Sequence, residues 1–403
     1  MKFEINKKNW KPVKLGDVVV KKEENDKKNA QKRFDRFLKV EHMDAESLHI
    51  KRWSSQEDGD EINPTFYKIF RKGQILFPTR NPHLRRAVLA SFDGICGEKT
   101  LTLEANTDLV LPEFVAFLFH SNSFYSHTTS SIVGSTNPHV RWRDVASFEF
   151  LLPPVTEQEQ LLELFWSSDE EVQHKKSTRN KLENLLDSLV EERVHGVDLG
   201  GKTIKEVIHE LGLSTNIKTL GELGAIFKGK GIPKSEVINT GLPCIRYGEL
   251  YTKHHRIIRE FHSFISKESV RKSIQIECGD ILFASSGETI SEIGKSAVFV
   301  SDVESYAGSD IIIFRPFEMD PVFSGYLMNS QLVRQQLNKL GTGATVMHVY
   351  ASDIEKIRVP VFSLNKQTLI GEELESVFNN ISLACKSIER SHSLHSGLIN
   401  KVF

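Results

Sequence analysis

Short apolar runs bounded by Gly, Ser and Pro recur along much of the chain. Such runs are typical of buried β-strands. They include Gln74–Phe77, Asp280–Phe283, Ala297–Val300 and Ile311–Phe314. Two longer stretches, Pro112–Thr128 and Pro321–Leu340, have helical periodicity, and a turn-rich segment follows each of them. The pattern therefore predicts mixed α/β globular domains.

The chain consists of two related copies, offset by 209 positions over much of their length. Self-similarity at a fixed offset indicates a duplicated structural unit. The matched pairs include Pro112 with Pro321, Phe114 with Phe323, Leu118 with Leu327, Ser121 with Ser330, Gly134 with Gly343, Val140 with Val349, and Asp144 with Asp353. The offset also pairs Gln158 with Gln367 and Leu189 with Leu398. The last stretch of each half is therefore part of the repeat.

Nearer the start of each copy the offset is about 205, since Leu15-Gly16 matches Leu220-Gly221. Small loop insertions explain such drift. The repeat divides the chain into globular parts at 1–155 and 216–362, with a long helix and linker at 156–215 and a second long helix at 363–403. We expect an α+β chain of two tandem mixed α/β domains, each followed by a long helix.

The two helical segments carry apolar residues at spacings near three and four, which is typical of a heptad seam. The seam residues are Leu162, Phe165, Val172, Leu182 and Leu189 in the first copy, and Leu374, Val377, Ile381, Ala384 and Ile388 in the second. Lys175 and Arg179 interrupt the first seam. We expect the helices to pair with each other; the alternative is that each packs on its own globular domain.

Net charge, cysteine spacing and the absence of long apolar runs limit the classes of protein to which this chain can belong. The net charge of -1 supplies no global attraction to nucleic acid, so DNA affinity would have to come from local patches. The four cysteines form no C-x-x-C pair, which fits a reducing cytoplasm and disfavours a zinc knuckle. No signal peptide and no membrane-spanning run is evident.

Two local basic patches exist. The range 62–92 holds six Lys or Arg residues and no acidic residue, and 253–272 holds six against two Glu. Glycine-punctuated polar loops nearby carry Arg and Asn side chains for base edges and hydroxyls or Lys for phosphates. The candidate DNA-binding residues are Thr79, Arg80, Asn81, Arg85, Arg86, Ser135, Thr136, Lys228, Lys230, Arg246, Ser285, Ser286, Thr289, Lys295, Thr342 and Thr345. Each taken singly is equally compatible with a solvated surface loop.

Three patterns suggest catalysis or metal binding but lack the required context. Gly196–Thr203 has P-loop spacing, yet it follows the polar end of a long helix rather than a buried strand. Asn137-Pro138-His139 resembles part of an adenine methyltransferase signature, without its second Pro and its aromatic residue. His254-His255 lacks metal-site spacing and is expected in a basic, solvent-facing loop. We therefore expect no catalytic, cofactor or metal site in this chain.

Two diverged globular units, each closed by a heptad helix, resemble the specificity subunits of type I restriction-modification systems over essentially the whole chain. Local phrases are similar too: Lys218-Thr-Leu-Gly-Glu-Leu, Gly279-Asp-Ile-Leu-Phe-Ala-Ser-Ser-Gly, and Asp144 or Asp353 followed by a strand ending at Pro153 or Pro360. The family pattern departs at the link 197–216, where Thr203–Leu213 looks helical.

This resemblance implies that each globular unit is a target-recognition domain reading one half of a split, asymmetric double-stranded DNA target. The helices would run antiparallel as a coiled-coil spacer with pseudo-twofold symmetry. Adenine methyltransferase (M) subunits would dock on them, and restriction/translocase (R) subunits could join. S-adenosylmethionine, ATP and Mg would belong to those partners. Two alternatives stay open: a coiled-coil adaptor that never reads DNA, and a P-loop nucleotide-binding protein.

Overall fold

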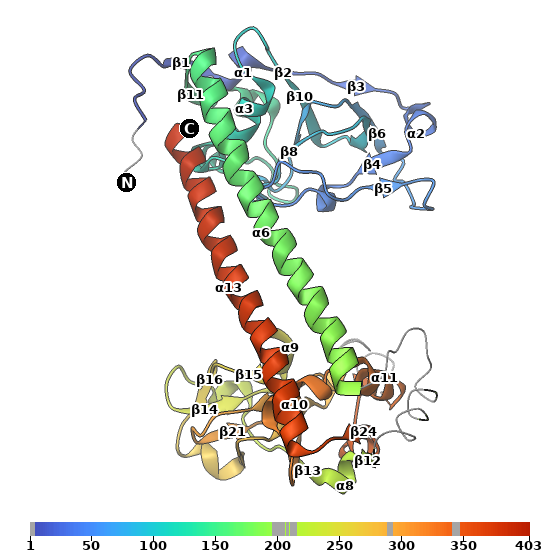
Figure 1. The fold of residues 1–403 in the computed structure, drawn as a ribbon. Helices are drawn as coiled ribbons and strands as arrows, with labels where there is room; N and C mark the ends of the chain where they lie inside the picture. The colour runs from blue at the N-terminus through green and yellow to red at the C-terminus, as the bar shows by residue number, and fades with distance from the viewer. Residues whose placement is uncertain (1–4, 196–205, 207–208, 210–215, 288–292, 341–346) are drawn as a thin grey trace. The chain divides into compact units, whose positions relative to one another are not determined.

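The protein is described by a computed structural model that covers residues 5–195, 206, 209, 216–287, 293–340 and 347–403. The chain divides into two compact units. Unit 1 comprises Met1–Ser177 with Lys386–Phe403, and unit 2 comprises Thr178–Cys385. Two long helices, α6 (Val155–His195) and α13 (Leu364–Val402), each contribute to both units (Figure 1). The sheets and helices confirm the predicted α+β class.

Unit 1 is built from short strands and helices. Its strands are β1 (Lys11–Lys14), β2 (Val19–Lys21), β3 (Glu24–Asn25), β4 (Arg36–Leu38), β5 (Ser54–Ser55), β6 (Phe66–Phe70), β7 (Ile75–Pro78), β8 (Val88–Leu89), β9 (Gly94–Gly97), β10 (Thr100–Ala105) and β11 (Glu149–Leu152). Its helices are α1 (Leu15–Val18), α2 (Ala30–Arg33), η1 (Val40–His42), η2 (Pro82–Leu84), α3 (Pro112–Leu118), α4 (Asn122–Ser130) and α5 (Trp142–Ala146). The strand orders are β1-β11, β2-β10-β7-β8 and β3-β6-β9-β4-β5.

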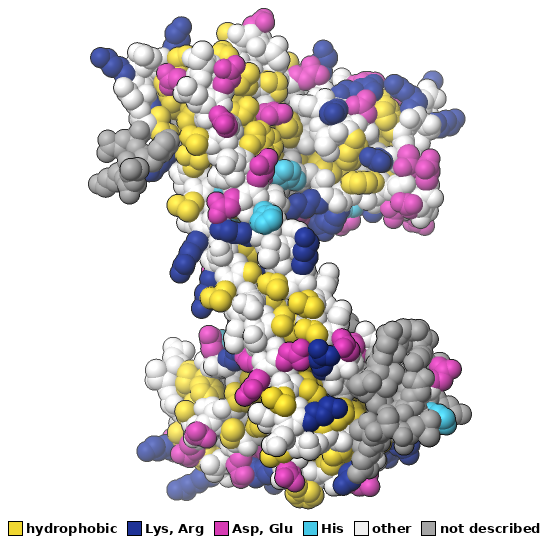
Figure 2. All heavy atoms as spheres, in the orientation of Figure 1, with side chains coloured by type: hydrophobic (Ala, Val, Ile, Leu, Met, Phe, Trp, Pro, Cys, Tyr) yellow, Lys and Arg dark blue, Asp and Glu magenta, His cyan; other side chains and the backbone are white. Residues whose placement is uncertain are grey.

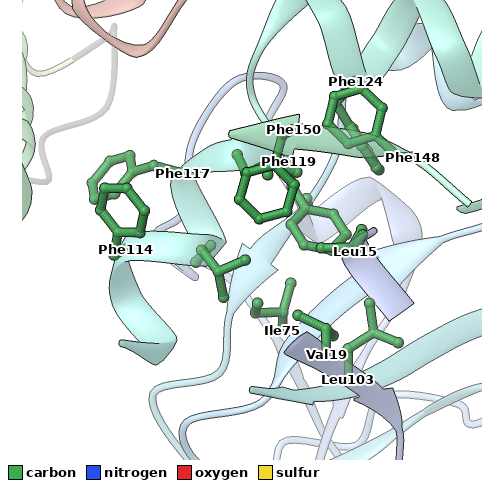
Figure 3. Close-up of a cluster of buried hydrophobic side chains, with 14 of the residues drawn as sticks. Leu15, Val19, Ile75, Leu103, Phe114, Phe117, Phe119, Phe124, Phe148 and Phe150 are labelled. Atoms are coloured by element: carbon green, nitrogen blue, oxygen red, sulfur yellow. The ribbon is translucent and has the colours of Figure 1, made fainter. Parts of the chain in front are cut away.

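The main core of unit 1 lies between the β2-β10-β7-β8 sheet and the helices α3 and α4. Ile75 and Leu103 reach it from adjacent strands, and Phe114, Phe117 and Phe124 reach it from the helices (Figure 3). All four residues of β7 are buried, which explains why its sequence is a continuous apolar run rather than an alternating one.

Unit 2 repeats this plan. Its strands are β12 (Asn216–Thr219), β13 (Gly224–Lys228), β14 (Leu242–Ile245), β15 (Arg256–Ile258), β16 (Ser263–Ile265), β17 (Ile274–Ile276), β18 (Ile281–Ala284), β19 (Ser286–Gly287), β20 (Ser296–Phe299), β21 (Ser305–Ala307), β22 (Ile311–Pro316), β23 (Met347–His348) and β24 (Arg358–Val361). Its helices are α8 (Leu220–Leu223), η3 (Lys234–Glu236), α9 (Tyr247–Thr252), η4 (Ser269–Lys272), α10 (Pro321–Leu327), α11 (Gln331–Leu340) and α12 (Ala351–Ile354). The strand orders are β12-β24, β13-β22-β18-β20-β15, β16-β14-β21-β17 and β19-β23.

Each long helical stretch expected from the sequence is two helices. The first divides into α3 and α4, and the second into α10 and α11. Ser121 lies at the first break and caps α4, because its side-chain oxygen accepts a hydrogen bond from the Phe124 N–H. The repeat places Ser330 at the second break. The periodicity predicted helix in both places and missed the cap that interrupts it.

Within unit 1, the first half of α6 lies antiparallel to the last part of α13. Phe165 packs on Phe403 with ring centroids 6.0 Å apart, and further along α6 Ser168 hydrogen-bonds to His395 at 2.7 Å. Lys175, which interrupts the apolar seam, donates to the Ser391 hydroxyl at 2.6 Å. Phe165 also contacts Phe117 of α3. The start of α6 therefore packs both on its own globular domain and on α13.

The same antiparallel arrangement holds within unit 2. Arg193 of α6 pairs with Glu373 of α13 at 3.0 Å, and both helices contribute to one hydrophobic cluster. Among the predicted seam residues, Phe165, Val172, Leu374 and Ile381 are buried, while Leu162, Leu182, Leu189, Val377, Ala384 and Ile388 are half-buried. The seam prediction missed Leu186, Val190 and Val194, which are all buried.

Candidate nucleic-acid interface

Two polar loops of unit 1 meet at the end of strand β7. The Thr79 N–H donates to the Lys99 carbonyl at 2.9 Å, and the Val140 N–H donates to the Thr79 carbonyl at 3.0 Å. Arg80 and His139 form an antiparallel bridge beside these bonds. The structure thus joins the 79–86 loop to the 133–140 loop, which the sequence analysis treated as separate.

The second loop is a tight turn whose tip carries Ser135 and Thr136. Gly134 adopts a φ of +86°, and a Cβ at that position would lie 3.1 Å from the Asn137 carbonyl oxygen. His139 Nδ1–H donates to the same oxygen at 2.9 Å, which closes the turn. Both hydroxyl residues at the tip are exposed. The segment Asn137-Pro138-His139 is therefore part of a turn.

Unit 2 repeats this junction with the same hydrogen bonds. The Ser285 N–H donates to the Asp310 carbonyl at 2.9 Å, and the Val349 N–H donates to the Ser285 carbonyl at 3.0 Å. Ser286 pairs with His348 across β19 and β23. The two junctions therefore correspond residue by residue. Thr79 of unit 1 matches Ser285 of unit 2, Lys99 matches Asp310, Arg80 matches Ser286, and His139 matches His348.

Of the other candidates in unit 2, Lys228 lies at the same end of the sheet, and Arg246 follows a strand of the other sheet. Lys228 pairs with Ile312 of β22, next to the pair between Ile311 and Ala284. Lys230 lies two residues further along and is exposed, as is Lys228. The remaining two are half-buried: Lys295 donates to the Tyr251 carbonyl at 3.2 Å, and Arg246 follows β14, whose Ile245 carbonyl accepts from Gly308.

Some predicted sites lie outside the described residues. These are Thr289, Thr342, Thr345, the P-loop-like segment 196–203 and nearly all of the expected linker helix 203–213. A further expectation was wrong for one of its two residues: His254 is buried, with its ring 5.5 Å from that of His262, whereas His255 is exposed. Burial lowers the pKa of His254 to about 4.

Carboxylates from distant parts of the sequence neutralise much of each basic patch. In the first patch, Glu23 lies 2.6 Å from the buried Lys68, and Glu24 lies 2.8 Å from Arg71. In the second, the partners are Asp187 for Arg256 and Glu375 for Arg259. Figure 2 shows Lys and Arg side chains interspersed with Asp and Glu on the visible face of both units.

The arginines of the first candidate loop differ in their surroundings. Arg85 forms an ion pair with Glu46 at 2.8 Å and lies 4.8 Å from the Tyr125 ring centroid. Arg86 donates to the Val40 carbonyl at 2.9 Å. Arg80 is exposed and faces no carboxylate within ion-pair distance among the described residues. Of the three, Arg80 alone combines an exposed side chain with a guanidinium that is not already bonded.

The other predicted residues of this loop have separate roles. Thr79 is buried and donates its hydroxyl to the Lys99 carbonyl at 2.8 Å, so it holds the loop rather than facing solvent. Asn81 is exposed and adopts the left-handed conformation with a φ of 50°. Sequence reasoning missed Lys99, His139, Asp310 and His348 as members of the two junctions. The repeat offset of 209, which pairs His139 with His348, was the signal that could have found two of them.

The described residues contain no group of three or more His, Cys, Asp or Glu side chains arranged to hold a metal ion. No helix in the described part of the chain is long and apolar enough to span a membrane. The predicted residues that come together are instead polar and basic side chains at one end of a sheet in each unit. Such side chains can contact phosphates and base edges.

Comparisons with known proteins point in the same direction. The family model for the type I restriction modification DNA specificity domain matches residues 7–184 and again 214–390. The specificity subunit of the type I restriction enzyme MjaVIII from Methanocaldococcus jannaschii is 24% identical over 297 residues, which are 70% of this chain and 68% of the relative. The double match agrees with the internal repeat and confirms the resemblance noted from the sequence.

Two solved structures share the fold. One is described as the structural basis underlying complex assembly and conformational transition of the type I R-M system; its TM-score is 0.60 at 20% identity, covering 98% of this chain and 97% of that one. The other is the S subunit of a type I restriction-modification system from M. genitalium, with a TM-score of 0.55 at 16% identity over 100% and 98% of the two chains. With the family model matching most of its length, this chain belongs to the type I restriction-modification DNA specificity family.

Proposed function

We propose that this chain, as a DNA specificity subunit, reads a two-part asymmetric target in double-stranded DNA and performs no chemistry itself. The observation that carries the proposal is the pair of matched junctions at Thr79 and Ser285. Their main-chain hydrogen bonds are the same, whereas their outward side chains differ. The same main-chain arrangement, carrying a different set of side chains in each unit, is suited to reading two different half-targets.

We further propose that the partners are adenine methyltransferase subunits and, in a restriction complex, translocase subunits. S-adenosylmethionine, ATP and Mg would act in those partners, in the cytoplasm. Family membership supports this, and so do apolar side chains left exposed on α13. Leu369 and Leu383 in unit 2 are 67% and 63% exposed, and Leu394 in unit 1 is 73% exposed. Exposed leucines of this kind fit contact with another protein chain.

The experiment that tests the function is a comparison of DNA methylation across the genome with and without this gene. We expect one bipartite motif to lose methylation when the gene is deleted, and to regain it on complementation. A second arm replaces residues 10–155 with the matching unit from a relative. Because each unit carries its own junction, the exchange is expected to change one half of the motif only.

Three outcomes would contradict the proposal or part of it. If deletion leaves every methylated motif in place, the chain does not direct a methyltransferase. A purified complex with methyltransferase subunits that binds all duplexes equally would instead support the adaptor alternative. Bases altered in both halves after the exchange would contradict independent reading by the two units.

A further inference from the structure

We infer that Arg80 is the side chain of unit 1 that reads a guanine of the target, and that the corresponding place in unit 2 lacks this capacity. The inference rests on the proposed DNA-reading function and adds which residue reads which base. Three observations support it: the position of Arg80 in the junction, the free guanidinium of Arg80, and the different residues that unit 2 has in place of Arg80 and Lys99.

The backbone at Arg80 is held on both sides while its side chain is left exposed. Arg80 bridges to His139, and the Asn81 N–H donates to the Pro138 carbonyl at 3.3 Å. The preceding Thr79 makes three hydrogen bonds, two to the Lys99 carbonyl and one from Val140. A fixed backbone reduces the ordering that binding requires, so a long side chain can act there with a defined direction.

The guanidinium of Arg80 is available in a way that its neighbours are not. Arg71 and Arg85 are bound to carboxylates, and Arg86 is bound to a backbone carbonyl. A planar guanidinium can donate two parallel hydrogen bonds to O6 and N7 of guanine in the major groove, and this contact discriminates guanine from the other bases. Lys99, whose carbonyl accepts the Thr79 hydrogen bonds, has an exposed side chain that pairs with Glu98 at 3.1 Å, so it is not free in the way that Arg80 is.

Unit 2 presents different chemistry at the same two places. Ser286 stands where unit 1 has Arg80, and Asp310 stands where unit 1 has Lys99. A hydroxyl and a carboxylate cannot donate the paired hydrogen bonds that guanine O6 and N7 accept. Exposed positive charges near this junction of unit 2 lie instead on Lys228 and on Lys230, at and just beyond the end of β13. The two units therefore differ in charge at the corresponding places.

The test measures binding of the complex with methyltransferase subunits to duplexes that carry the methylated motif. Each guanine is replaced in turn by 7-deazaguanine, which lacks the N7 acceptor. We expect the wild-type complex to lose about 5- to 150-fold in affinity at one guanine of the half-target read by unit 1. The Arg80→Ala complex should bind the natural duplex more weakly than wild type does. Its affinity should not fall further when that guanine is replaced by 7-deazaguanine.

Lys72→Ala is the matched control, because Lys72 is an exposed cation at the opposite end of β7 from Arg80. It is expected to keep the wild-type pattern of sensitive guanines. Melting temperature and copurification with the methyltransferase establish that the Arg80 variant is folded and assembled. An Arg80→Ala complex with the full wild-type pattern of sensitive guanines would overturn the inference. A wild-type complex that prefers no sequence would instead overturn the proposed function.

Discussion

Arg85 and Glu46 form an ion pair in which Nη1 and Oε1 lie 2.8 Å apart. Arg85 also hydrogen-bonds to the Asn122 side chain and stacks over Tyr125, both in α4, so the Glu46 segment and this helix meet at one guanidinium. Arg85 adopts a left-handed conformation with a φ of 53°. From the sequence, Arg85 and Arg80 were equivalent candidates for DNA binding. In the structure, the contacts of Arg85 instead hold the 79–86 loop in place.

We predict that Arg85→Ala destabilises unit 1 without changing the bases that are read. Losing a partly buried arginine leaves Glu46 without this partner, and we expect a loss of about 1–3 kcal/mol in unfolding free energy. Urea denaturation measures the loss, and methylation mapping at permissive temperature measures the motif. An altered motif at full stability would contradict this assignment. Arg80→Ala is the contrasting variant, with an altered motif and unchanged stability.

We predict that acid weakens unit 1 through His120. Burial lowers the pKa of His120 to about 3, against about 6.5 in an unfolded chain, so the folded state binds fewer protons between these values. The stability contributed by neutral His120 is therefore complete above about pH 6.5 and decreases as the pH falls toward 3. The slope is at most about 1.4 kcal/mol per pH unit for one histidine.

Urea unfolding between pH 7.5 and pH 5 measures this slope. His120→Gln keeps a side-chain N–H for the Ala87 carbonyl that His120 contacts, and should make the slope shallower. His83→Asn is the matched control, because His83 is an exposed histidine of the same unit, and it should leave the slope as it is. An unchanged slope in His120→Gln would show that other groups produce the acid sensitivity.

We predict that Phe165→Ala strongly destabilises unit 1. The Phe165 ring is fully buried, stacks on Phe114 at 5.9 Å and packs at a tilt on Phe117 at 5.0 Å. Removing it leaves a cavity, for which we expect a loss of about 3–5 kcal/mol. Leu164→Ala, one position earlier on the exposed face of α6, should change stability by less than about 0.5 kcal/mol. Denaturant midpoints of the two variants give the comparison, and similar losses in both would contradict the packing role.

We predict that lengthening both long helices by one turn changes the spacing of the two half-targets. Both α6 and α13 contribute to both units, so a matched insertion after Ser177 and after Cys385 is required. Four residues add about 6 Å of helix, and base pairs are stacked about 3.4 Å apart. The methylated motif should then have one or two more base pairs between its halves.

Two-residue insertions at the same places are the control for this experiment. They rotate each apolar seam by about 200° and are expected to prevent pairing. Assembly of the four-residue variant with the methyltransferase is checked by copurification. If an assembled variant still methylates motifs of the original spacing, the helices do not set the number of base pairs between the two half-targets.

Much of the architecture could be read from the sequence because hydrophobic periodicity and the repeat are properties of the chain order. The buried strands β7, β18, β20 and β22 lie within one or two residues of the predicted runs. The long helices α6 and α13 begin at Val155 and Leu364, next to the predicted positions 156 and 363. The division of each shorter helical stretch at Ser121 and Ser330 was missed, because periodicity continues across a cap.

The candidate site depended on contacts between distant parts of the chain. The sequence by itself determined the duplication, the fold class and the set of polar loop residues, since each of these follows from residue order. Only the tertiary structure decided that Glu24 and Glu46 bind Arg71 and Arg85, and that Arg80 stays free. Electrostatic neutralisation depends on distance in space, and these carboxylates lie about 40 to 50 residues away along the chain.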